Sequence, residues 1–102
     1  MNYEKFADLF TAALEKDNRA LYIKEYSENS NDIDILTNIW DNAHMTVREI
    51  VKQSGMTQAQ FSKRFCIPLR TIENWVTNKR KAPDYIRLLL EKELGLLKVH
   101  CE

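Results

Sequence analysis

Apolar residues recur at helical spacing along most of the chain. Near its start they fall three or four positions apart, which places them on one face of a helix. These residues are Phe6, Leu9, Phe10, Ala13 and Leu14. The pattern predicts a helix over about 2–16, with Asn2 as its N-cap. Its apolar face is interpreted as part of a core or as a dimer seam.

Two more helices are expected before residue 45. The first covers about 18–26, and its candidates for burial are Leu21, Tyr22 and Tyr26. A polar loop follows at 27–31, and Asn31 or Asp32 then caps a helix that continues to Ala43. The chain has no long alternation of β-branched residues and no hairpin signal, so the sequence predicts an all-α fold with six or seven helices.

The second half of the chain repeats one helix-start pattern. Thr46 and Glu49 form a capping box, and Thr57 and Gln60 form another eleven residues later. Apolar residues flank both boxes at the positions of a hydrophobic staple. The sequence therefore predicts helices over about 46–54 and 57–65, with the first ending at Gly55.

Prolines introduce two further helices. Pro68 fits the first turn of a helix over 68–76, and Pro83 starts a last helix that Gly95 ends. The apolar positions assigned to this last helix are Ile86, Leu89, Leu90 and Leu94. Asn78 is expected to adopt the left-handed conformation in the intervening break. The tail over 96–102 is expected to fray or to pack lightly.

Composition and charge narrow the class of protein. The 102 residues include only two cysteines, so no disulfide framework is expected, and a reducing cytoplasmic location is predicted. No signal peptide or membrane span is expected. The net charge is zero overall, but residues 1–45 carry −5 and residues 46–102 carry +5. Such a division is typical of nucleic-acid binding, although fluctuation within a short chain is the alternative.

The two short helices around 57–65 and 68–76 have the arrangement of a helix-turn-helix motif. Its inward positions are predicted to be Phe61, Phe65, Ile67, Ile72 and Trp75. The second helix then presents Arg70, Thr71 and Asn74 outward. Arginine can bind guanine O6 and N7 bidentately, and asparagine pairs similarly with adenine, so these residues are candidates for base contacts. The alternative for each is a solvated helix face.

A basic segment follows the second helix of this motif. Asn78, Lys79, Arg80 and Lys81 are candidates for contacts with the phosphate backbone. The alternative is a solvated exit loop. Trp75 is assigned to the core rather than to base stacking, because it lies on the side of Phe61 and Ile72.

Residues 46–94 resemble the Xre/Cro, phage-repressor-like family of helix-turn-helix proteins. The resemblance rests on the segments 57–58, 67–72 and 79–83, together with Phe61 and Trp75. It implies a sequence-specific transcriptional regulator, a repressor that is usually a homodimer. It also implies that Gln58 anchors its helix on phosphate or a base edge, although a purely capping role is the alternative.

The chain departs from this family at three positions. Cys66 stands where the turn usually has glycine, which is acceptable if the backbone stays out of the left-handed region. Val76 replaces a common acid, and Asn78 replaces a common glycine. Cys66 is expected to be a buried structural cysteine, with redox sensing as the less favoured alternative.

Other functions find little support in the sequence. No phosphate-binding glycine loop or nucleophile elbow occurs, so no enzyme and no cofactor are predicted. His100, Cys101, Cys66 and His44 lack the spacing of a zinc site, so no metal is predicted.

The expected organisation has three parts. An acidic helical segment over 1–44 precedes a helix-turn-helix domain over 45–95, and the tail over 96–102 follows. The acidic segment serves packing, dimerisation or partner binding. The alternative function is that of an antitoxin, in which residues 1–44 bind a basic protein partner and DNA binding is autoregulatory.

Overall fold

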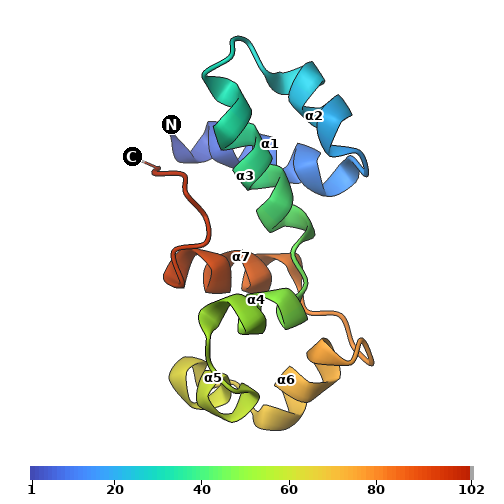
Figure 1. The fold of residues 1–102 in the computed structure, drawn as a ribbon, viewed down its shortest axis with the longest axis vertical. Coiled ribbons are helices and arrows are strands. Elements are labelled where there is room, and N and C mark those ends of the chain that lie inside the picture. The colour runs from blue at the N-terminus through green and yellow to red at the C-terminus, as the bar shows by residue number, and fades with distance from the viewer. Residues whose placement is uncertain (102) are drawn as a thin grey trace. The chain divides into compact units, whose positions relative to one another are not determined.

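The protein is all-helical in the computed structural model, which describes residues 1–101. This part of the chain contains seven α-helices and no strand (Figure 1), which confirms the predicted all-α class. The helices are α1 (Tyr3–Glu15), α2 (Arg19–Tyr26), α3 (Asp32–His44), α4 (Val47–Ser54), α5 (Gln58–Phe65), α6 (Leu69–Val76) and α7 (Asp84–Glu93). None of the helices within 1–101 has the length and apolar character that a membrane span requires.

The helices are grouped into two compact units. The acidic unit contains Met1–His44 together with the segment that begins at Gly95, and the basic unit contains Met45–Leu94. Residues 1–44 hold nine acidic and four basic side chains, whereas residues 45–94 hold ten basic and five acidic ones. The division by contacts therefore coincides with the division by charge.

The acidic unit is built around α3, against which α1 and α2 pack. Phe6 and Phe10 are buried one turn apart on α1, and Leu36 and Ile39 are buried on α3. Tyr22 is the buried residue of α2, and its hydroxyl donates a hydrogen bond of 2.8 Å to the Leu9 carbonyl. This bond satisfies the one polar atom of a side chain that is otherwise buried in apolar surroundings.

The C-terminal segment packs on the acidic unit, so of the two expectations for the tail, fraying or packing, the structure shows packing. Leu97 is buried, and the amides of Asn38 and Asn42 each donate to the Leu96 carbonyl at 3.2 Å. The backbone N–H of Lys98 donates a hydrogen bond of 2.7 Å to the side-chain oxygen Oδ1 of Asn38. The sequence signal was weak because two separate asparagines on α3 supply these contacts.

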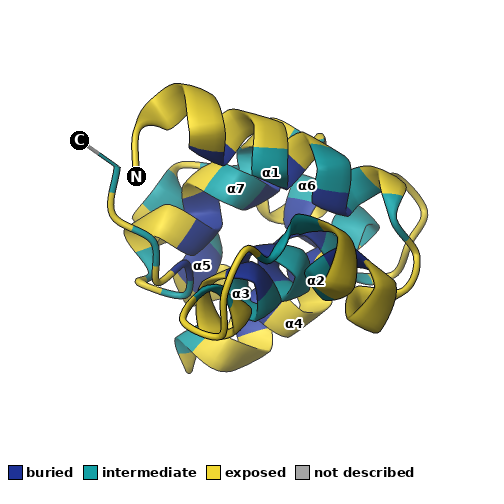
Figure 2. Cartoon of the chain, turned by 90° about the horizontal axis from the view of Figure 1, so that it is seen from above, coloured by how far each residue is buried: buried dark blue, intermediate teal, exposed yellow. Residues whose placement is uncertain are grey.

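The basic unit places α4 against α6 and α7, and α5 against α6. Both predicted capping boxes are present, at Thr46 with Glu49 and at Thr57 with Gln60. Figure 2 shows buried, intermediate and exposed positions mixed along the helices, as expected of helices that are buried on one side only. The core residues of this unit include Val47, Ile50, Val51, Phe61, Ile72 and Leu90.

The buried face of α7 differs from the predicted one. Leu89 is largely exposed, whereas Arg87 and Glu91 are buried one turn apart beside Leu90. Arg87 is satisfied there, because its guanidinium donates to the Met45 carbonyl at 2.7 Å and forms an ion pair with Asp84. A pattern that counts only apolar residues assigns such a face incorrectly.

Leu21 on α2 of the acidic unit is another predicted core residue that is exposed.

Candidate nucleic-acid interface

A tight turn joins α5 to α6 and fixes the angle between them. The Ser62 hydroxyl donates to the Ile67 carbonyl at 2.5 Å, and the Ile67 N–H donates to the Ser62 carbonyl at 3.1 Å. Ser62 is also small enough to let the two helices cross closely. The structure adds a hydrogen-bonding role, because the side chain binds the turn directly to α5.

The residue that ends α5 has an unfavourable backbone conformation. Cys66 lies in the left-handed region at φ 55° and ψ 39°, and its N–H donates to the Ser62 carbonyl. The condition for accepting a non-glycine residue here, a backbone outside the left-handed region, is therefore not met. The expectation that Cys66 is buried is wrong, since its side chain is exposed. The short turn requires the left-handed conformation whichever residue occupies the position.

Replacing Cys66 with glycine is expected to stabilise the basic unit by about 0.5–1 kcal/mol. Glycine relieves the left-handed strain, which outweighs the extra freedom that glycine gives to the unfolded chain. Urea unfolding measures the difference. The control is Cys66→Ala, which retains the strain and removes only an exposed thiol. Equal stabilities of the glycine and alanine variants would contradict the assignment of strain to this residue.

The predicted base-contacting residues lie along one side of α6. Arg70 is exposed in the first turn, and none of its side-chain atoms makes a hydrogen bond or ion pair within residues 1–101. Thr71 and Asn74 are half-buried. On the opposite side of the helix Ile72 is fully buried against the core. The structure therefore leaves Arg70 the most accessible of the three side chains.

The predicted phosphate-contacting residues follow directly after α6. Asn78 adopts the expected left-handed conformation, with φ 61°, and it reverses the chain. The N–H groups of Lys79 and Arg80 then donate to the Asn74 carbonyl at 2.9 and 3.2 Å. These bonds hold the backbone of the loop, while the side chains of Lys79, Arg80 and Lys81 are exposed and make no ion pair within the described part of the chain.

Two other predicted residues occupy intermediate positions. Gln58 is half-buried as the first residue of α5, immediately after the capping Thr57. Trp75 is half-buried rather than fully in the core, in contrast to Phe61, which is completely buried. Gln58 and Arg70 both belong to the first turn of their helices.

Sequence reasoning missed the buried carboxyl group of the basic unit. Glu91 is completely buried, and neither of its carboxyl oxygens has a hydrogen-bond partner within residues 1–101. This burial raises the pKa of Glu91 to about 8, and the nearby Arg87 lowers it by a smaller amount. Arg87, Leu90, Glu91 and Leu94 have the spacing of one helix face, but the two charged residues among them hide it from a pattern of apolar positions.

The structure identifies no metal-binding cluster within residues 1–101, since no three His, Cys, Asp or Glu side chains are grouped there. Comparison of the chain with protein-family models, with curated proteins and with solved structures finds no match.

Proposed function

We propose that the basic unit binds double-stranded DNA as a sequence-specific transcriptional regulator, with α6 inserted into the major groove. One observation carries the proposal. A short helix has an exposed arginine in its first turn and three consecutive exposed cations shortly after its last turn, and none of these four side chains forms an ion pair within residues 1–101. The opposite side of the same helix is anchored in the core by Ile72.

In this proposal Arg70 reads a base edge, because the first turn of a recognition helix lies deepest in the groove. A bidentate contact between a guanidinium and guanine is the strongest of the base contacts open to this helix. Thr71 and Asn74 contribute further base contacts from the same side of α6. Their partial burial gives them a shorter reach than Arg70 has.

The loop after α6 binds the phosphate backbone in the same proposal. The eight residues of α6 span roughly 12 Å, so Arg70 and the three cations contact the duplex from opposite ends of the helix. The hydrogen bonds to the Asn74 carbonyl hold the loop at the helix end and reduce the entropy lost on binding. Gln58 and Asn78 make the remaining contacts with the phosphate backbone of the DNA.

The regulator is proposed to act as a homodimer and as a repressor, as the resemblance to the Xre/Cro family implies. Tyr85 and Leu89, one turn apart on α7, expose 65% and 58% of their surfaces. Paired large apolar side chains on a helix surface are typical of protein contacts. A dimer of this kind would bind a DNA site with two-fold symmetry.

Replacing Lys79 with alanine is expected to weaken binding to all duplexes about equally. Each phosphate contact releases about one counterion, so the slope of log K against log salt concentration falls by about one unit. Fluorescence anisotropy with a labelled random-sequence duplex at several salt concentrations measures this slope. The matched control is Lys24→Ala, which removes an exposed lysine from α2 of the acidic unit. If both variants retained the parent slope, the exit loop would not contact phosphate.

A further inference from the structure

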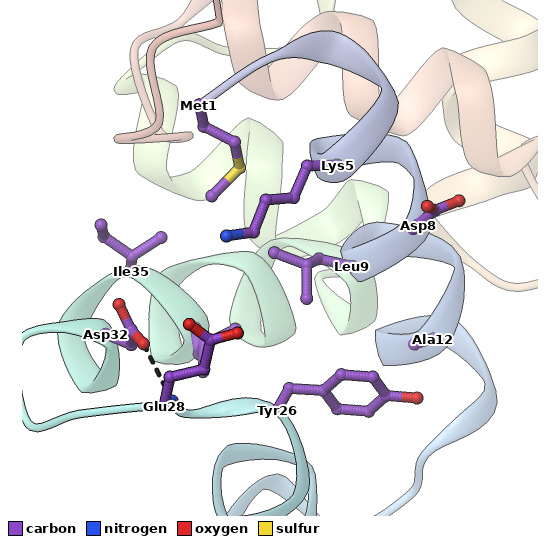
Figure 3. A pocket seen from close by; sticks show the side chains of 10 residues that line it. Met1, Lys5, Asp8, Leu9, Ala12, Tyr26, Glu28, Asp32 and Ile35 are labelled. Carbon is purple, nitrogen blue, oxygen red and sulfur yellow. Dashed lines mark hydrogen bonds between the residues drawn. The ribbon is translucent and has the colours of Figure 1, made fainter.

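A groove with an apolar floor opens on the surface of the acidic unit. It is lined by α1, by the loop between α2 and α3, and by the first turns of α3, and it encloses about 370 Å³. Figure 3 shows Leu9 and Ile35 facing the groove from its two sides, with Met1 at one end and Tyr26 at the other. Ile35 is 40% exposed there, although it is a large apolar residue.

The rim of this groove is acidic. Asp8, Glu28 and Asp32 line it together with Lys5 and with Met1, the residue that bears the N-terminal amino group. The Asp32 carboxylate is occupied, since it accepts a hydrogen bond from the N–H group of Glu28 at 2.9 Å (Figure 3) and another from that of Asn29 at 3.3 Å. The exposed carboxylates of Asp8 and Glu28 have no ion-pair partner within residues 1–101.

We propose that this groove binds an amphipathic, basic helix of a protein partner. An apolar floor between helical elements accepts the apolar face of such a helix. Glu28, whose carboxylate faces the groove, and Asp8, at its outer edge, have no ion-pair partner within residues 1–101, so both can pair with lysine or arginine side chains that flank this face (Figure 3). The surplus of acidic residues in the unit attracts a basic segment and repels nucleic acid.

This inference is independent of DNA binding, because the groove and the proposed DNA-binding residues belong to different units. It makes the expectation of a basic partner for residues 1–44 specific to one site. A second copy of this chain is the competing occupant of the groove. Measuring the oligomeric state of groove variants distinguishes it from a helix of another protein.

The test uses the full chain and two synthetic helical peptides as probes. One peptide carries leucine on one face and lysine on the others, and the second has glutamate in place of every lysine. At about 0.15 M salt, fluorescence anisotropy is expected to show saturable one-to-one binding of the lysine peptide. The glutamate peptide is expected to bind at least about tenfold more weakly, because like charges face each other across the rim.

Matched variants locate the binding site. Ile35→Ser is expected to lower the affinity for the lysine peptide about tenfold. Ile33→Ser, which alters an exposed isoleucine outside the groove, is expected to leave this affinity unchanged. Glu28→Lys is expected to lower the same affinity about fivefold, whereas Asp17→Lys, an equal charge change outside the groove, has little effect on it. Circular dichroism confirms that each variant is folded.

Four results would overturn the proposal. The first is that the lysine peptide fails to bind, and the second is that both peptides bind equally well. The third is that the groove variants and their controls behave alike, which would mean non-specific attraction to an acidic protein. The fourth is that sedimentation equilibrium shows a dimer of the parent chain that Ile35→Ser converts to a monomer, which would assign the groove to a second copy of the chain. None of these results depends on whether the basic unit binds DNA.

Discussion

Raising the pH from 5 to 9 is expected to lower the free energy of unfolding of the basic unit by about 4 kcal/mol through Glu91 alone. Burial raises the pKa of this carboxyl to about 8 in the folded protein, while Arg87 opposes the shift only partly. The unfolded chain has the ordinary glutamate value of about 4.3. Between these two values the folded state holds a proton that the unfolded state has lost.

The sign of the effect follows from this difference in bound protons. Below about pH 4.3 both states are protonated, and the stabilising contribution of the neutral, buried carboxyl is fully present. It declines as the pH rises, and it is lost once the folded carboxyl ionises near pH 8. A domain of this size is stabilised by about 5–15 kcal/mol in total, so the change is a large fraction of its stability.

Urea unfolding at a series of pH values measures the effect. Glu91→Gln is expected to flatten the pH profile, because the amide does not ionise in this range. The matched control is Glu73→Gln, an exposed acid on α6, which is expected to retain the parent profile. If the parent and Glu91→Gln gave profiles of equal slope, the Glu91 carboxyl would not be the group responsible.

Replacing Arg70 with alanine is the second substitution with a large expected effect. Loss of a bidentate arginine–guanine contact costs about 1–3 kcal/mol of binding free energy, which is about 5- to 150-fold in affinity for the preferred site. The preference at one base pair of each half-site is expected to be lost at the same time. Competition titrations with duplexes that vary at single positions measure both changes.

Arg70→Lys separates the geometry of the side chain from its charge. Lysine keeps the positive charge but lacks the planar fork that matches two acceptors of guanine. The variant is therefore expected to lose base preference while it keeps the salt dependence of the parent. Unchanged base preference in both Arg70 variants would show that another residue reads the bases.

The elements of this fold were predictable because local signals at the helix ends agree with the apolar spacing. Thr46 and Thr57 begin α4 and α5 as their capping boxes predict, and Gly55 adopts the left-handed conformation that ends α4. Capping depends on residues that are neighbours in the sequence, so it can be recognised without knowledge of the tertiary structure.

The faces of some helices were not predictable, because partners distant in the sequence decide them. Arg87 is buried with its guanidinium donating to the Met45 carbonyl, 42 residues away, in addition to its ion pair with the nearby Asp84. Glu91 is buried with no hydrogen-bond partner for its carboxyl oxygens within residues 1–101, and this burial raises its pKa to about 8. The packing of the C-terminal segment similarly depends on Asn38 and Asn42, which lie more than fifty residues away.

The candidate site shows the same division. Arg70 and the three cations after α6 are exposed, as expected of residues that contact a partner. The left-handed backbone of Cys66 was missed, because the sequence alone does not show that the turn forces this conformation on a residue with a side chain.

Selection of bound duplexes from a random DNA library, at near-physiological salt, tests the proposed function most directly. The parent chain is expected to enrich a two-fold symmetric motif, whose half-site spacing gives the geometry of the dimer. The Arg70→Ala variant is expected to lose the motif or to blur one position of each half-site. Binding of duplexes without enrichment of any sequence would mean that the protein contacts only the phosphate backbone and does not read bases. Absence of binding would contradict the proposal that this protein recognises DNA.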